Sequence, residues 1–83
     1  MEPSLQDRYY SAGTCFGCGP CNRHGLQIKS YSSGNGVAAT WTASDKYDNG
    51  FGFVNGGIIS TLLDCHSAAC LMKETVKRYG DFC

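Results

Sequence analysis

The chain has 83 residues, of which 42% are hydrophobic and 17% are charged, and its seven basic residues balance its seven acidic ones. This length allows one small domain, and the zero net charge excludes the strongly basic surface of a protein that binds nucleic acid or an anionic membrane. A domain of this size buries only ~60% of its unfolded surface, so we expect it to need additional stabilisation from its cysteines, a metal or a partner subunit.

No export signal or membrane anchor is predicted. Residues 1–12 contain no apolar run, and the longest uninterrupted apolar stretch, residues 68–72, is far shorter than the ~20 residues of a membrane-spanning helix. We therefore expect a soluble, cytoplasmic protein whose six cysteines are reduced rather than paired in disulfides.

Residues 1–24 form an N-terminal segment rich in cysteine and glycine, in which no regular period predicts a helix or a strand. Its centre, Cys15-x2-Cys18-x2-Cys21-x2-His24, offers four ligands of the kind that Zn²⁺ binds. The spacing is tighter than the usual zinc layout, in which two ligand pairs lie well apart, and favours a glycine-rich loop with buried thiols. We expect no metal here that folding requires, and no cofactor in the protein.

Residues 25–83 form the second region, which begins with a predicted β-hairpin at residues 26–42. Residues 26–31 and residues 37–42 each show the alternation with a period of two that places successive side chains on opposite faces of a strand. Between them, the Asn35-Gly36 pair can adopt the positive φ angles of a tight turn. A glycine-spaced loop is predicted for residues 43–57.

A long helix is predicted from about Gly56 to Arg78, with Asn55 as its N-cap. Its first half is apolar over most of its circumference, so it should be wrapped by other structure, with Cys65 and Cys70 as small core residues. Two strands cannot wrap such a helix. We therefore expect a partial domain that is truncated after the helix, or covering strands supplied by another chain.

Two features of the helix could support chemistry. The backbone N–H groups of Gly56 and Gly57 have no Cβ beside them and could bind an anion or a developing oxyanion, although these glycines could also serve close packing. Asp64 lies in a polar stripe formed with Ser60, Thr61 and Ser67. Its partial burial would raise the pKa toward general-base use, although the neighbouring hydroxyls could simply satisfy it.

A catalytic pair within the helix is not expected. His66 is two residues from Asp64 and adjacent to Cys65, and side chains at these offsets point in different directions. His66 is therefore interpreted as an ordinary core or surface histidine.

The string Val54-Asn-Gly-Gly-Ile-Ile-Ser-Thr-Leu-Leu-Asp-Cys65 resembles the central-helix motif of the hotdog-fold thioesterases, specifically the PaaI-like acyl-CoA thioesterase family. That motif is His or Asn, then Gly-Gly, then Asp or Glu nine positions after the His or Asn, and Asn55 and Asp64 have this spacing. The segment from Cys15 to Leu26 is similar to a lead segment in the same superfamily. The resemblance implies an α+β hotdog fold, in which an antiparallel sheet wraps a long central helix.

The resemblance also implies roles for individual residues. Asp64 matches the catalytic carboxylate that acts as general base or nucleophile on the thioester, and Gly57 matches the backbone N–H that polarises its carbonyl. Asn49 falls where relatives place an amide that positions substrate or water, and Asn55 replaces the commoner His and should cap the helix. The substrate-binding residues that it implies are Asn55, Gly56 and Thr61.

Helix geometry adds an argument for a partner subunit. Gly57 and Asp64 lie about 10 Å apart along the axis, so one thioester carbonyl cannot contact both groups of one chain. Geometry thus favours a second protomer, and the resemblance implies a homodimer or tetramer that hydrolyses an acyl-CoA thioester to a free acid and the CoA thiol. Two alternatives remain: a non-enzymatic, cysteine-rich metal-binding or interaction module centred on Cys15 to His24, and a catalytically inactive hotdog remnant that serves as a binding domain.

Overall fold

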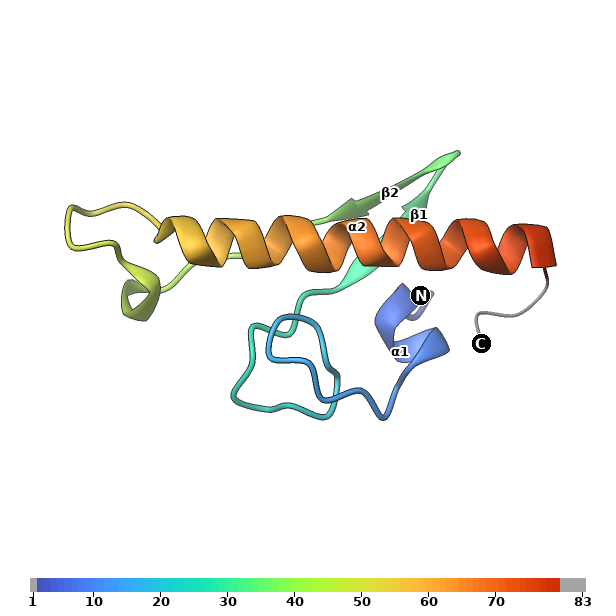
Figure 1. Ribbon diagram of the computed structural model, residues 1–83, viewed down its shortest axis with the longest axis horizontal. Coiled ribbons are helices and arrows are strands. Elements are labelled where there is room, and N and C mark those ends of the chain that lie inside the picture. The colour runs from blue at the N-terminus through green and yellow to red at the C-terminus, as the bar shows by residue number, and fades with distance from the viewer. Residues whose placement is uncertain (1, 80–83) are drawn as a thin grey trace.

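A computed structural model describes residues 2–79, which form a small α+β domain (Figure 1). In chain order its elements are α1 (Leu5–Tyr9), β1 (Ser30–Ser33), β2 (Gly36–Ala39), the short 3-10 helix η1 (Asp45–Tyr47) and α2 (Gly56–Tyr79). Within these residues the two strands form one antiparallel sheet, which does not enclose α2. None of the helices in this part of the chain is long and apolar enough to cross a membrane.

The predicted long helix is confirmed as α2, which has 24 residues and ends one residue later than expected. The Asn55 side chain caps its start, because Oδ1 accepts a hydrogen bond of 2.7 Å from the Gly57 N–H. Lys77 and Arg78 lie in the last turn, where positive charge interacts favourably with the helix dipole.

Helix α1 was not predicted, since residues 1–24 were interpreted as irregular throughout. Ser4 caps this helix, with its Oγ accepting a hydrogen bond of 3.0 Å from the Asp7 N–H. Leu5 and Gln6 on the buried side then pack into the core. The local signal was the Ser4-x-x-Asp7 pattern, which is typical of a helix N-terminus.

The predicted hairpin is present but shorter than residues 26–42. The register pairs Ser33 with Gly36, so the two turn residues are Gly34 and Asn35. Gly34 takes the positive φ of 59°, and the prediction that Asn35-Gly36 supplies the positive φ angles is wrong. Glycine with positive φ at the first of two central positions is the arrangement of a type II′ turn.

Residues 26–29 extend from the hairpin but pair with the N-terminal segment instead of with β2. The Leu26 N–H donates to the Phe16 carbonyl at 2.7 Å, and the Ile28 N–H donates to the Gly17 carbonyl at 3.1 Å. This pairing holds the cysteine-rich segment beside the stretch of chain that leads into β1 (Figure 1).

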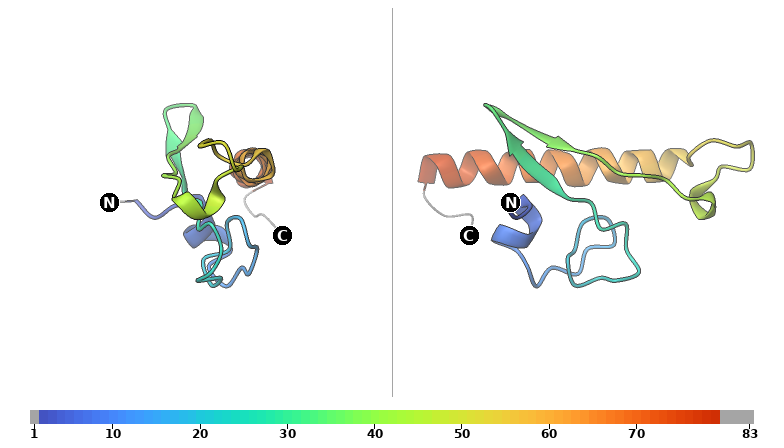
Figure 2. Two further views of the ribbon diagram at one scale, coloured as in Figure 1. Left: turned by 90° about the vertical axis from the view of Figure 1, so that its left-hand side faces the viewer. Right: turned by 180° about the vertical axis from the view of Figure 1, so that it is seen from behind.

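The core lies on one part of the α2 surface, between the helix, the hairpin and the N-terminal segment. The view along α2 in Figure 2 shows the hairpin to one side of the helix and the N-terminal segment below it. The buried apolar residues form two neighbouring clusters, Cys18, Leu26, Ile28 and Cys65 in one and Leu5, Ala69 and Met72 in the other.

The rest of the α2 surface is open. Ile59, Leu63 and Leu71 are exposed by 46%, 64% and 66%, and Cys70 is also exposed. In the described part of the chain no element covers this side of early α2, so its wrapping by further strands or by another chain stays a prediction, whereas the predicted core position of Cys70 is wrong. The hairpin contacts α2 on the side of His66 and Lys73, and the N-terminal segment covers the side on which Cys65 lies.

A buried polar bridge connects α1, β1 and α2 through Gln6, Ser30 and His66. Gln6 Oε1 accepts from the Ser30 N–H at 2.8 Å, and Gln6 Nε2 donates to Ser30 Oγ at 3.1 Å. Ser30 Oγ in turn lies 3.0 Å from His66 Nδ1. Since Gln6 and Ser30 are fully buried, loss of either partner would leave polar groups without water or protein to bond.

We predict that Gln6→Leu, which preserves most of the side-chain volume, lowers the free energy of unfolding by about 1–3 kcal/mol, because it leaves the Ser30 N–H buried without an acceptor. Urea denaturation measures the loss. Arg8→Ala, a change at an exposed position of the same helix, should alter stability by less than about 0.5 kcal/mol. Equal stability of the two variants would contradict the bridge.

Candidate functional site

The start of α2 presents two glycines, and one of their N–H groups already has an acceptor. Gly56 and Gly57 are exposed, and a Cβ at Gly56 would have no neighbour within 4 Å. The Gly57 N–H donates to Asn55 Oδ1. A substrate carbonyl could therefore bind Gly57 only if the Asn55 side chain rotated away.

Asp64 lies on the open surface of α2. Asp64 follows Gly57 by seven residues, which is close to two full helical turns. The carboxylate and the glycines therefore lie on nearly the same side of the helix. Ser60 and Ser67 are exposed beside it. The partial burial that was expected for Asp64 is absent in the single chain, because the strands cover a different side of the helix.

The polar side-chain atoms of Asn49 and Thr61 form hydrogen bonds within their own segments. Asn49 Oδ1 accepts from the N–H groups of Phe51 and Phe53 at 2.8 and 3.3 Å and so shapes the exposed loop before α2. Thr61 Oγ1 donates to the Gly57 carbonyl at 2.9 Å, and the residue is half-buried. Neither side chain is brought against Asp64 by a hydrogen bond.

The prediction that His66 forms no pair with Asp64 is confirmed. His66 Nδ1 contacts Ser30 on β1, whereas Asp64 lies on the open surface. The two side chains leave α2 in different directions, as residues two apart on a helix must.

A mostly apolar hollow of about 240 Å³ lies between the hairpin and α2. Leu63, which lines it, immediately precedes Asp64. The lining residues are Ile28, Ala39, Trp41, Leu62, Leu63 and His66.

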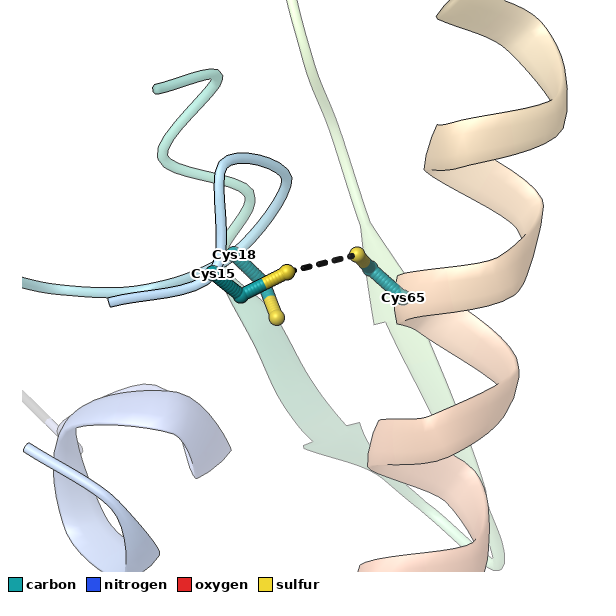
Figure 3. Close-up of side chains that lie close together, drawn as sticks. All are labelled: Cys15, Cys18 and Cys65. Atoms are coloured by element: carbon teal, nitrogen blue, oxygen red, sulfur yellow. Dashed lines mark hydrogen bonds between the residues drawn. The ribbon is translucent and has the colours of Figure 1, made fainter. Parts of the chain in front are cut away.

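The structure brings three thiols together, Cys15 and Cys18 from the N-terminal segment and Cys65 from α2 (Figure 3). Their sulfur atoms all lie within 4.8 Å of one another, and Cys15 Sγ and Cys65 Sγ are 3.9 Å apart. The set that the sequence singled out is not assembled. The Cys21 thiol instead donates to the Ser11 carbonyl at 3.2 Å, and His24 is exposed.

The environments of these thiols differ. The backbone N–H groups of Cys18 and Gly17 lower the pKa of Cys15, and the Gly17 nitrogen lies 3.4 Å from its sulfur. Burial, followed by the hydrogen bond with Cys18, raises the pKa of Cys65 to about 12. Tyr10 Oη lies 3.2 Å from Cys18 Sγ, and burial raises the pKa of this phenol.

Gln27 holds the cysteine-rich loop in shape. Its Nε2 lies 3.0, 3.2 and 2.7 Å from the carbonyl oxygens of Gly19, Pro20 and Asn22. Its backbone has φ 58°, a left-handed conformation that is unfavourable for a residue with a Cβ. The side-chain hydrogen bonds are what hold Gln27 in this conformation.

Comparisons of the chain with protein-family models, with curated proteins and with solved structures find no match.

We predict that Gln27→Ala destabilises the protein more than Gln27→Gly does. Both changes remove the amide that bonds the loop carbonyls, but glycine relieves the left-handed backbone of its ~1–2 kcal/mol penalty. Thermal unfolding of the two variants measures the difference. A glycine variant that is no more stable than the alanine variant would contradict the left-handed conformation at Gln27.

Proposed function

We propose that the protein hydrolyses an acyl-CoA thioester, with Asp64 as the catalytic carboxylate. One observation carries the proposal: Asp64 is exposed on the same side of α2 as the glycine-rich, Asn55-capped start of that helix. Thioester hydrolysis needs a carboxylate to activate the attacking group and a backbone N–H to stabilise the oxyanion. At this helix start the donor would be the Gly56 N–H, or the Gly57 N–H once the Asn55 side chain rotates away. The resemblance of residues 54–65 to the hotdog thioesterase motif supports the same assignment.

In this reaction the Asp64 carboxylate takes a proton from a water molecule, whose oxygen attacks the acyl carbon, or attacks that carbon itself. The carbonyl oxygen gains negative charge, which a backbone N–H at Gly56 or Gly57 stabilises. When Asp64 acts as base, the bond between carbon and sulfur then breaks, the free acid is released, and protonated Asp64 returns its proton to the CoA sulfur. When Asp64 acts as nucleophile, the same bond breaks to leave an anhydride between the acyl group and Asp64, which one water molecule hydrolyses to the free acid and the carboxylate, supplying the proton of the CoA thiol.

The apolar hollow beside Leu63 supplies a place for the acyl group. Its volume of about 240 Å³ is just below the range of ~300–1,000 Å³ for pockets that hold drug-sized ligands, which favours a short acyl chain. Trp41 and Leu62 on its wall offer an apolar surface that excludes water from the chain.

A second copy of the chain completes the site. Gly57 and Asp64 of one helix are about 10 Å apart along its axis, so one carbonyl takes its N–H donor from one protomer and meets Asp64 of the other. The exposed Ile59, Leu63 and Leu71 give the open surface of α2 the apolar character of an interface. We infer that α2 is the central helix of a hotdog fold whose open side is covered in the assembly.

We predict that Asp64→Asn lowers turnover of short-chain acyl-CoA substrates by at least ~10²-fold, because the amide cannot act as base or nucleophile. Thioester hydrolysis is followed by trapping the released thiol, with a thermal melt to verify folding. Glu74→Gln, at another exposed carboxylate of α2, is the matched control and should keep full activity. Normal turnover in folded Asp64→Asn, or no hydrolysis by the wild type, would refute the proposal and favour a binding domain.

We predict that the protein sediments as a dimer or tetramer at assay concentration and that Leu71→Lys dissociates it, with loss of activity. A charge placed on the apolar surface of α2 would have to be desolvated in the interface. Phe16→Lys is the control, because Phe16 is exposed by 63%, close to the 66% of Leu71, but lies on the N-terminal segment. A fully active monomer would contradict the shared site.

A further inference from the structure

The cysteine cluster lies at the contact between the N-terminal segment and α2. Cys15 and Cys65 are 50 residues apart in sequence, yet their sulfurs approach to 3.9 Å, and the sulfur of Cys18 lies within 4.8 Å of both (Figure 3). Cys18 and Cys65 are also members of the larger core cluster. The three sulfur atoms therefore converge at one point between the N-terminal segment and α2.

Their spacing is close to that of a thiolate metal centre. Sulfur ligands with bonds of about 2.3 Å in a tetrahedral arrangement lie about 3.8 Å from one another. The pair formed by Cys15 and Cys65 already has this separation, and the other sulfurs need to move by no more than about 1 Å to reach it. An ion could thus bind all three sulfurs without rearrangement of the backbone.

The surroundings also suit an ion. The Gly17 N–H points at Cys15 Sγ, and N–H groups of this kind stabilise the thiolate that a metal requires. Tyr10 Oη, 3.2 Å from Cys18 Sγ, provides an oxygen beside the cluster for a fourth ligand, and Cys15 is exposed, which gives the ion a path of entry.

We propose that Cys15, Cys18 and Cys65 bind one Zn²⁺ ion that fastens the N-terminal segment to α2. Each thiol gives its proton to solvent and binds as a thiolate, and the Tyr10 hydroxyl or a water molecule occupies the fourth position. Three thiolates select a soft or borderline cation over Mg²⁺ or Ca²⁺. The ion links segments 50 residues apart, which supplies a small domain with a crosslink that its core alone cannot provide.

The site differs from the one that the sequence suggested, and two cysteines outside the cluster provide controls. Cys21 and Cys70 are exposed and are not members of the group. Variants at these two positions retain all three proposed ligands. Cys15→Ser is the most informative ligand variant, since an exposed side chain can be replaced with little effect on folding.

The test uses the reduced, chelator-treated protein and titrates it with Zn²⁺ by calorimetry, and with Co²⁺ as a spectroscopic probe of thiolate ligation. We expect one equivalent per chain, a rise in Tm with added Zn²⁺, and affinity at least ~10-fold weaker in Cys15→Ser and in Cys65→Ser. Cys21→Ser and Cys70→Ser should bind as the wild type does.

Three results would overturn the proposal. The first is that the reduced protein binds no Zn²⁺. The second is that binding depends on Cys21 and His24 and is unaffected in Cys15→Ser and Cys65→Ser. The third is that the protein purified under reducing conditions contains a disulfide between Cys15 and Cys65 and takes up no metal after reduction. If Cys65→Ser does not fold, the titration of folded Cys15→Ser decides the matter alone.

Discussion

The close approach of the Gly17 turn to α2 is the contact on which the rest of the structure depends. A Cβ at Gly17 would collide with the Cys65 sulfur and the Thr61 methyl group, so only glycine lets the segment lie this near the helix. The approach brings Cys15 and Cys18 to Cys65 and lets the Gly17 carbonyl accept from the Ile28 N–H. The N-terminal segment, the hairpin and α2 therefore meet at a single point.

This packing divides α2 into two surfaces with different roles. One surface packs into the core, where Cys65, Ala69 and Met72 are buried. The other exposes Asp64 among apolar side chains, where no described element covers it. An exposed apolar surface of this kind marks a site of interaction, and for this reason we propose that catalysis and self-association take place there and that the thiol cluster contributes to structural stability.

Local sequence patterns predicted the parts of the structure that local forces determine. Periodicity and the Asn55 cap were sufficient for α2, because one helix satisfies its own backbone. The left-handed Gln27 could not be foreseen, since hydrogen bonds to the carbonyls of a loop without regular structure hold it there. Cys65 was correctly expected to be buried, but its place beside Cys15 depends on a contact across 50 residues that no spacing rule encodes.

The most direct test of this account is the rate at which each cysteine of the native, reduced, metal-free protein reacts with an alkylating reagent, resolved by mass spectrometry. Cys65 and Cys70 lie on the same helix, but the first is packed against the Gly17 turn and the second is exposed. We expect Cys70 to react promptly, as should Cys15 with its lowered pKa, and Cys65 to react far more slowly. Equal rates for Cys65 and Cys70 would contradict the packing of the N-terminal segment on α2.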